Sequence, residues 1–290
     1  MNAIPELAAL LARAERVLER LEAVLPASPE PPDWGAATAF RWRRRHGRAG
    51  LEAVLAPHRI RLSDLKDVDD QKQRIDRNTR QFLAGRHANN VLLTGARGTG
   101  KSSLVKALLT AHAKNGLRLI EVDKSDLIDL PDIVELVRGR PERFILFCDD
   151  LSFEEGEAAY KALKSVLDGS VAAVSDNVLI YATSNRRHLM PEYMDENLQA
   201  RHRDGEVHPG EAVEEKISLS ERFGLWLSFY PFSQDEYLAV VRHWLKRFQV
   251  PAAEFETARG EALQWALMRG SRSGRVAWQF ARDYAGRYEP

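Results

Sequence analysis

Short apolar runs alternate with segments of helical periodicity through the middle of the chain, from residue 89 to residue 185. A short apolar run suits a buried strand, whereas apolar residues spaced three or four apart suit a helix that packs on one face. The pattern predicts strands at 90–93, 117–122, 144–148 and 178–182. It predicts helices near 101–113, 131–138 and 156–168. Such alternation is typical of an α/β fold, in which crossover helices join the strands of a parallel sheet.

The pattern changes on both sides of this region. From residue 233 onward only helical periodicity remains, and we expect three helices at 233–248, 256–269 and 274–287. Earlier in the chain we expect an amphipathic helix at 5–25, a proline-rich linker at 26–35 and a helix at 68–84. The polar stretch 190–217 is expected to be a surface insertion. These expectations divide the chain into an N-terminal helical and linker region (1–59), an α/β domain (60–231) and a helical lid (232–290).

The composition sets limits on what the chain can be. Its 290 residues, 44% of them hydrophobic, suffice for two domains with a sizeable core. Lys and Arg number 42, as do Asp and Glu, so no global field attracts nucleic acid or anionic lipid. The only cysteine, Cys148, cannot form an intrachain disulfide, which suits a reducing compartment. With no apolar stretch of membrane-spanning length and no signal-peptide pattern, we expect a cytoplasmic protein without a membrane partner.

A glycine-rich motif follows the first predicted strand. Its pattern is G-x-x-x-x-G-K-[ST], in which glycines let the backbone wrap a phosphate chain and amide N–H groups point at phosphate oxygens. Lys101 would neutralise the β- and γ-phosphates, and the Ser102 hydroxyl could bind Mg²⁺. The other interpretation is a coincidental glycine-rich turn. The candidate phosphate-binding residues are Gly95, Ala96, Arg97, Gly98, Thr99, Gly100, Lys101, Ser102 and Ser103.

Polar residues follow two further strands. The run 144–148 ends in Asp149 and Asp150, the Walker B arrangement. Asp149 would hold Mg²⁺, and Asp150 would orient or deprotonate an attacking water. The strand at 178–182 leads to Asn185, whose amide could reach between these acids and a γ-phosphate. The plainer alternatives are an acidic turn after a core strand and an ordinary Ser-Asn turn.

Two arginines complete the set of candidates. Arg222 precedes the last sheet segment and could project into a neighbouring subunit as an arginine finger; otherwise it is a solvated connection. Arg275 lies in the first turn of the last helix, where it opposes the helix dipole unless an anion is bound nearby. Arg272 is an alternative for that second role. Arg272 and Arg275 could also be merely solvated side chains.

These elements, taken in order, resemble the AAA+ ATPase superfamily over about residues 60–290. The segments ILFCDDLSFEEGE, IYATSNRRHLMPE and EEKISLSERFGLWLSFYPF are similar to the bacterial family catalogued as domain of unknown function 815, described as predicted ATPases. The resemblance implies an α/β P-loop NTPase with a parallel sheet flanked by helices and a three-helix lid. It also implies ATP and Mg²⁺ as cofactors, homo-oligomeric rings or spirals, and Leu65, Val68 and Gln71 near the base.

Two departures from common AAA+ patterns are informative. Most members end Walker B in Asp-Glu, whereas this chain has Asp149-Asp150, which suggests slow turnover with nucleotide acting as a switch. Protein unfoldases thread substrates with an aromatic loop between the second strand and Walker B. The interval 124–143 contains no aromatic residue, so threading of polypeptide is disfavoured.

The basic run Arg41–Arg48 leaves the partner open. Five arginines and a tryptophan could bind a phosphate backbone and stack a base. They could equally form a solvated helix face, or pair with Glu154, Glu155 and Glu157. The expected function is a Mg²⁺-dependent ATPase that remodels an unknown protein partner. The alternatives are a DNA-binding switch like a helicase loader or initiator, and a nucleotide-gated scaffold with negligible turnover.

Overall fold

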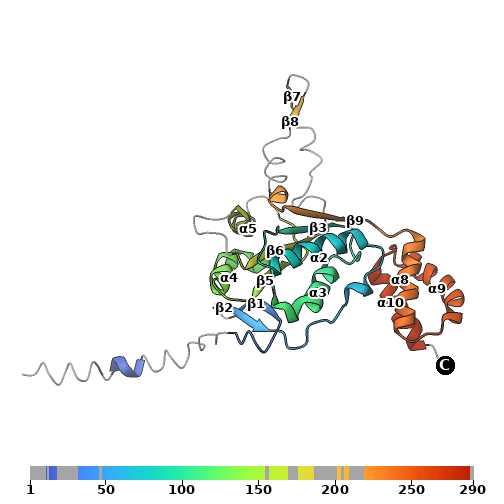
Figure 1. Cartoon of the computed structure of the whole chain (residues 1–290), viewed down its shortest axis with the longest axis horizontal. Coiled ribbons are helices and arrows are strands. Elements are labelled where there is room, and N and C mark those ends of the chain that lie inside the picture. Colours follow the sequence, from blue (N-terminus) through green and yellow to red (C-terminus); the bar gives the residue numbers. More distant parts are fainter. Residues whose placement is uncertain are drawn as a thin grey trace, which may run out of the picture.

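A seven-stranded sheet forms the centre of the computed structural model (Figure 1). The structure describes residues 11, 13–17, 32–45, 48–153, 157–168, 176–185, 201–203, 206–208 and 219–287. The strand order is β2-β1-β4-β5-β6-β3-β9, and every neighbouring pair is parallel except β1 and β2. The strands are β1 Ala39–Arg45, β2 Arg48–Ala53, β3 Val91–Gly95, β4 Leu117–Glu121, β5 Arg143–Cys148, β6 Val178–Ser184 and β9 Leu225–Phe229.

Helices cover both faces of this sheet. Helices α2 (Asp69–Leu83) and α3 (Lys101–His112) share one apolar cluster with alternate strand residues such as Leu93 and Phe147. Helices α4 (Leu130–Val137) and α5 (Ala158–Asp168) pack with the strand residues of the opposite face. Successive side chains of a strand point to opposite faces of the sheet. Strands that are apolar along their whole length therefore pack against the helices on both faces.

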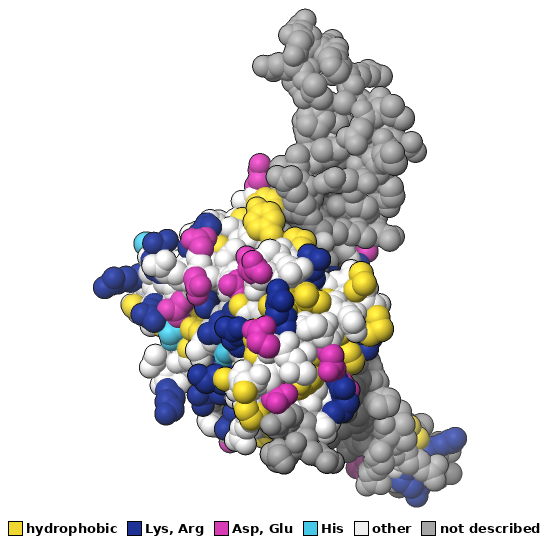
Figure 2. Space-filling view, turned by 90° about the vertical axis from the view of Figure 1, so that its right-hand side faces the viewer, with side chains coloured by type: hydrophobic (Ala, Val, Ile, Leu, Met, Phe, Trp, Pro, Cys, Tyr) yellow, Lys and Arg dark blue, Asp and Glu magenta, His cyan; other side chains and the backbone are white. Residues whose placement is uncertain are grey.

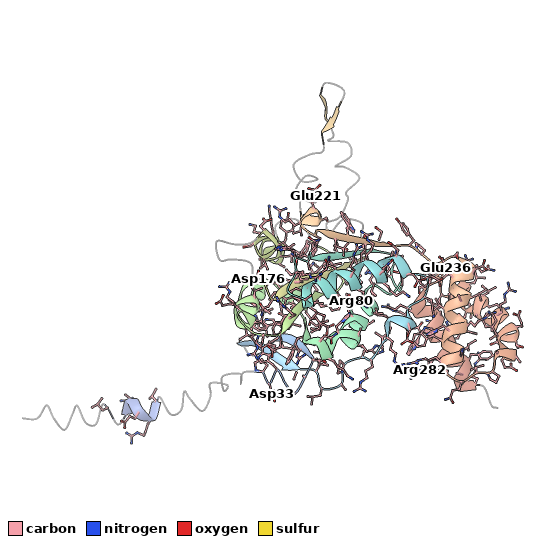
Figure 3. The ribbon with its side chains drawn as sticks, in the orientation of Figure 1. Asp33, Arg80, Asp176, Glu221, Glu236 and Arg282 are labelled. Carbon is pink, nitrogen blue, oxygen red and sulfur yellow. The ribbon has the colours of Figure 1, made fainter. Side chains whose placement is uncertain are left out.

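The C-terminal helices form a separate core beside the sheet (Figure 1). They are α8 (Gln234–Arg247), α9 (Phe255–Met268) and α10 (Gly274–Arg287). Ser233 and Glu236 close the start of α8 with a reciprocal capping box, which satisfies two backbone N–H groups. Charged side chains such as Arg80 on α2 and Arg282 on α10 lie on the helices that cover the sheet and form the lid (Figure 3).

These observations confirm the predicted α/β fold with a three-helix lid. The four predicted strands correspond to β3, β4, β5 and β6, and the helix predicted at 68–84 is α2. For the last strand, β9, the sequence predicts a sheet segment after Arg222 but gives no residue range. Short 3₁₀ turns connect the elements at Leu62–Asp64, Ala113–Asn115, Lys124–Asp129 and Ala252–Glu254.

The expectation for residues 1–59 is wrong at its C-terminal end, because β1 and β2 extend the central sheet. Residues 41–45 of the basic run belong to a strand, not a helix, and three of its arginines are paired with carboxylates. Arg41 donates to Glu121 at 2.6 Å, Arg43 to Asp123 at 2.8 Å, and Arg44 to Asp129. The buried indole of Trp42 donates to Asp129 at 2.9 Å. The carboxylates of β4 and the following turn therefore hold this strand at the sheet edge.

Several sequence expectations lie largely outside the described residues. They are the helix at 5–25, most of the linker at 26–35, Glu154, Glu155 and most of the insertion at 190–217. Within that insertion, Arg201–Arg203 and Glu206–His208 pair as the antiparallel strands β7 and β8. Glu157 accepts a hydrogen bond from Lys124 at 3.0 Å. Among the residues described, no helix combines the length and apolar character needed to cross a bilayer.

Candidate functional site

The candidate residues converge at the carboxyl ends of β3, β5 and β6. These strands are neighbours in the sheet, with Leu93 opposite Thr183 and Cys148 opposite Ala182. The residues that follow them therefore meet at one edge, which is where open α/β sheets bind ligands. The loop after β3 leads directly into α3, so the N-terminal amides of that helix also face this edge.

Lys101 is the centre of the loop that follows β3. It is the first residue of α3 and is buried. Its Nζ donates to the carbonyl oxygens of Gly95 at 2.7 Å and Ala96 at 2.8 Å, and to Asn185 Oδ1 at 3.0 Å. The Thr99 hydroxyl also donates to the Ala96 carbonyl, at 2.8 Å. Carbonyl oxygens of the loop thus hold the Lys101 ammonium group beside the loop's own amides.

The charge on Lys101 is costly where it lies. Burial lowers its pKa to about 8; the carboxylates of Asp150 and Asp149 oppose that shift, and Arg97 and Arg275 add to it. Burial thus disfavours the protonated amine by more than the two carboxylates stabilise it. An anion placed beside Lys101 would stabilise the protonated form.

The two acids at the end of β5 have different partners. Asp149 Oδ1 accepts from the Ser102 hydroxyl at 2.6 Å and from the Thr183 hydroxyl at 2.5 Å. The carboxylate of Asp150 accepts from the amide of Asn185. The Asp150 backbone lies in the left-handed region with φ of 54° and donates to Thr183 Oγ1 at 2.8 Å. A non-glycine residue rarely adopts this conformation, and such strain is concentrated at functional positions.

Ser102 and Asp149 offer donors that suit Mg²⁺. Hydroxyl and carboxylate oxygens are its preferred ligands, and it is usually held by one or two carboxylates together with substrate phosphates. No group of three His, Cys, Asp or Glu side chains within the described residues could hold a metal alone. The donor set therefore fits a cation that shares its ligands with a bound phosphate.

The lid closes over the loop from the other side. The N-terminus of α10 packs so tightly on Gly98, whose φ is +77°, that a Cβ there would lie 2.8 Å from Ser273 Oγ. That hydroxyl caps α10 by accepting from the Val276 amide at 3.3 Å. Further along, the buried Asp64 carboxylate lies 3.5 Å from His243 Nε2 of α8. The lid thus lies against the rest of the chain at two separate points.

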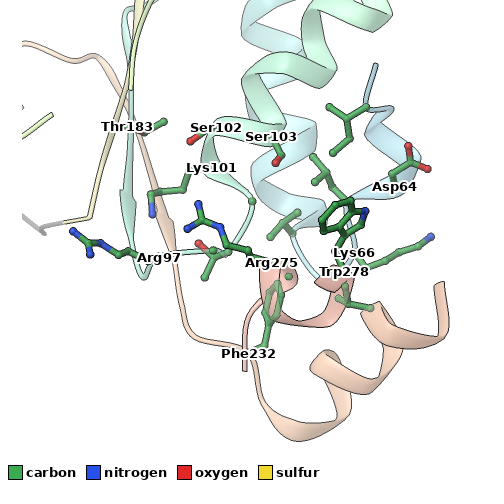
Figure 4. A pocket seen from close by; sticks show the side chains of 18 of the residues that line it. Asp64, Lys66, Arg97, Lys101, Ser102, Ser103, Thr183, Phe232, Arg275 and Trp278 are labelled. Atoms are coloured by element: carbon green, nitrogen blue, oxygen red, sulfur yellow. The ribbon is translucent and has the colours of Figure 1, made fainter. Parts of the chain in front are cut away.

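A cavity of about 660 Å³ lies between the sheet and the lid (Figure 4). Residues 97–103, Asp149, Asp150, Thr183, Asn185 and Arg275 line one part of it. Its remaining wall is largely apolar and aromatic. That wall includes His58, Ile60, Leu65, Val68, Val240, Trp244 and Trp278.

Some expected residues are absent from this cavity, and some unexpected ones line it. Leu65 and Val68 line it as expected, whereas the Gln71 amide instead donates to the Ser228 carbonyl at 2.9 Å. Trp244 and Trp278 were missed, because in sequence they are ordinary members of amphipathic helices. His58 and Ile60 were missed as well, since they lie at the boundary assigned to the N-terminal region, and no spacing signal marks them.

Arg222 stands apart from the other candidates. It follows the short helical turn at 219–221 and forms an ion pair with Asp168, at the end of α5. It does not line the cavity, whereas Arg275 does. Within one chain, the structure therefore gathers residues 97–103, Asp149, Asp150, Asn185 and Arg275 around one cavity, whereas Gln71 and Arg222 do not line it. Gly95 and Ala96 adjoin the cavity through their hydrogen bonds with Lys101.

This sheet order, with a glycine-rich loop between β3 and α3 and a three-helix lid, is that of the AAA+ P-loop fold. The chain belongs to the family described as "Protein of unknown function (DUF815)", which matches residues 35–288. That match includes β1 and β2, in agreement with their place in the sheet. No curated protein matches the sequence.

The solved structure of a AAA domain supports this fold. The AAA domain of FIGL-1 in complex with ADP aligns with a TM-score of 0.51 and 16% identity, over 79% of this chain and 73% of that one. A point variant of RuvB from Thermotoga maritima aligns with a TM-score of 0.46 and 13% identity. That alignment covers 75% of this chain but only 60% of the RuvB chain. At these identities the likeness concerns the fold alone.

Proposed function

We propose that this protein is a Mg²⁺-dependent ATPase that acts as an assembly of identical subunits. The observation that carries the proposal is the hydrogen-bonded series Lys101–Asn185–Asp150, with the Ser102–Asp149 pair beside it. These are the groups that phosphoryl transfer requires: a cation for the phosphates, oxygen ligands for a metal, and a carboxylate to position water. The neighbouring FIGL-1 domain, which was solved with ADP, supports a nucleotide as the ligand.

Each residue would have a distinct role in hydrolysis. Lys101 and the amides of residues 95–102 would bind the phosphates, while Arg275 would hold them from the lid. Mg²⁺, held by Ser102 and Asp149, would neutralise phosphate charge. Asp150 would orient the attacking water and accept its proton, and Asn185 would fix the Asp150 carboxylate in place. The aromatic wall at Trp244 and Trp278 would contact the base.

Nucleotide titration of Lys101→Ala tests the proposal directly. Lys106→Ala is a matched control on the same helix, because Lys106 points toward Glu121, 4.0 Å away, and does not line the cavity. We expect calorimetry with Mg²⁺ and ADP to show binding by the wild type and by Lys106→Ala, and a loss of at least about 100-fold in Lys101→Ala. Unchanged affinity in Lys101→Ala would show that the loop is not the binding site. Steady-state phosphate release would separate an enzyme from a scaffold.

The proposed assembly rests on the position of Arg222, which pairs with Asp168 and does not line the cavity. Since this arginine does not reach the cavity of its own chain, we propose that it completes the site of an adjacent subunit. Arg222→Ala should then bind ATP but release phosphate slowly, and so should Asp150→Asn. Mixing the two variants should restore part of the activity, because some interfaces would combine an intact finger with an intact Asp150. If no mixture regains activity, Arg222 has only its structural role with Asp168.

We further propose that lid movement on hydrolysis acts on a protein partner in the cytoplasm. The contacts of α10 with the loop at Gly98 offer a direct route from phosphate to lid. DNA is the less favoured partner, because Arg41, Arg43 and Arg44 are paired with carboxylates. On the face seen in Figure 2, basic and acidic side chains are interspersed and form no single-sign patch. DNA binding that weakens steeply with salt would reverse this preference.

A further inference from the structure

The side chain of Arg97 has no role in the phosphate loop as assigned so far. Loop residues bind phosphates through backbone amides, and the glycine pattern does not specify the residue at this position. Arg97 is exposed, lines the same cavity as Lys101 and Asp150, and is followed by Gly98, on which the lid packs. Its long cationic side chain is therefore at the mouth of the candidate site.

No ion pair or hydrogen bond occupies the Arg97 guanidinium among the residues that the structure describes. The carboxylates of Asp149 and Asp150 accept instead from Ser102, Thr183 and Asn185. Arg97 is close enough to Lys101 to contribute to its lowered pKa. An arginine that repels a neighbouring lysine and pairs with no acid is placed for an anion that arrives from outside.

The direction of the side chain indicates which part of a nucleotide it would meet. Figure 4 shows Arg97 extending to the side of Lys101 opposite to Arg275 and Trp278. A nucleotide whose base contacts Trp278 and whose phosphates pass Lys101 would reach Arg97 with its last phosphate. A guanidinium can bind two phosphate oxygens at once, which a lysine cannot do with the same geometry.

The charge count leads to the same conclusion. Arg97, Lys101 and Arg275 are three cations at this part of the cavity, and Asp149 and Asp150 are two acids. The excess of positive charge favours the ligand with more negative charge. A triphosphate carries an additional charged group compared with a diphosphate, and Arg97 lies where that group would extend.

We propose that the side chain of Arg97 binds the terminal phosphate and makes this loop selective for nucleoside triphosphate over diphosphate. This inference rests on the proposed nucleotide binding and extends it. Arg97 acts within its own chain, so it requires no neighbouring subunit, in contrast to the role proposed for Arg222.

The test is a comparison of two affinities in Arg97→Ala. Calorimetry with Mg²⁺ and the slowly hydrolysed analogue ATPγS should show a loss of about 10- to 100-fold, the effect expected of a charge-assisted hydrogen bond. The affinity for ADP should stay within about threefold. Arg97→Lys should retain part of the selectivity. Arg74→Ala is the control, because Arg74 is an α2 arginine that pairs with Asp70 at 3.6 Å and does not line the cavity.

The possible results are distinguishable. Equal losses for ATPγS and ADP would mean that Arg97 only shapes the loop, and would overturn the inference. Unchanged affinities for both ligands would overturn the inference as well. That conclusion holds even if Arg97→Ala changes the size of the oligomer. If the wild type binds neither ligand, the proposed nucleotide binding itself fails. Thermal unfolding of each variant would show that the exposed substitution leaves the fold intact.

Discussion

Replacing Gly98 by alanine would test whether the lid must pack on the phosphate loop. The new Cβ would lie 2.8 Å from Ser273 Oγ and 2.9 Å from Ser273 Cβ, both closer than non-bonded atoms tolerate. The atoms in conflict belong to the residue that caps α10, close to its backbone. The loop or the lid must therefore shift, and a shift of either one alters the cavity between them.

The expected magnitude has two parts. Gly98 has a φ of +77°, and a left-handed conformation costs an L-residue about 1–2 kcal/mol. Displacement of Ser273 would weaken the cap on α10, which is worth about 1 kcal/mol. The left-handed cost is present with and without ligand, so it lowers only the unfolding free energy. If the lid moves while the fold survives, the cost of about 1 kcal/mol at the cap would appear as a loss of roughly fivefold in nucleotide affinity.

Gly139→Ala is a matched control. Gly139 has a similar φ of +71°, but a Cβ added there would meet no atom within 4 Å, and the residue lies on the exposed turn between α4 and β5. This variant should lose about 1 kcal/mol of unfolding free energy with no change in nucleotide affinity. Urea unfolding and calorimetry with Mg²⁺ and ADP would measure both quantities. Wild-type affinity in Gly98→Ala would refute the reasoning that the lid contact defines the site.

Two further predictions follow from buried polar groups. Burial lowers the Lys101 pKa from 10.5 in the unfolded chain to about 8 in the folded one. Between pH 8 and pH 10.5 the unfolded state therefore binds more protons than the folded state. The unfolding free energy of the ligand-free protein should thus rise with pH across this range. Nucleotide favours the protonated amine, so nucleotide binding near pH 8 should take up protons. Calorimetry in two buffers of different ionisation enthalpy would measure this proton uptake. An uptake by the wild type equal to that of Lys101→Met would contradict the prediction. Trp42→Phe removes the indole donor to the buried Asp129, so unfolding free energy should fall by about 1–3 kcal/mol with ADP affinity unchanged; unchanged stability in urea would show that this contact does not hold β1.

Much of the candidate site could be predicted from sequence because its signals are local. The motif around Lys101 is one contiguous stretch, and the acids after β5 are another. Parallel strands must bring their carboxyl ends to one edge of the sheet, so the two stretches meet there. The lid helices were predicted closely for a similar reason. Their apolar spacing is regular, and a strong capping residue, Ser233, precedes α8.

The basic strand shows where local reasoning fails. Phe40 and Trp42 alternate as a strand requires, yet four of the residues from Arg41 to Arg45 are arginines, which obscures the polar face. What makes the strand possible is the set of acceptors Glu121, Asp123 and Asp129, more than seventy residues away. Distant charge pairing leaves no periodic signal, so the edge of the sheet was not predicted.

The apolar and aromatic wall of the cavity was only partly predictable for a related reason. Trp278 belongs to the lid and His58 to the segment before α2, and only the packing of lid on sheet brings them together. The role of Arg222 stays a prediction, because it concerns contacts between chains.

The central claim is that a nucleoside triphosphate binds between the loop at Lys101 and the lid. The most direct measurement is a crystal structure of the protein with Mg²⁺ and a non-hydrolysable ATP analogue. The account predicts triphosphate density along residues 95–102, a metal beside Ser102 and Asp149, and the base against the wall that contains Trp278. Analogue bound at another place, with this cavity empty at saturating ligand, would contradict it.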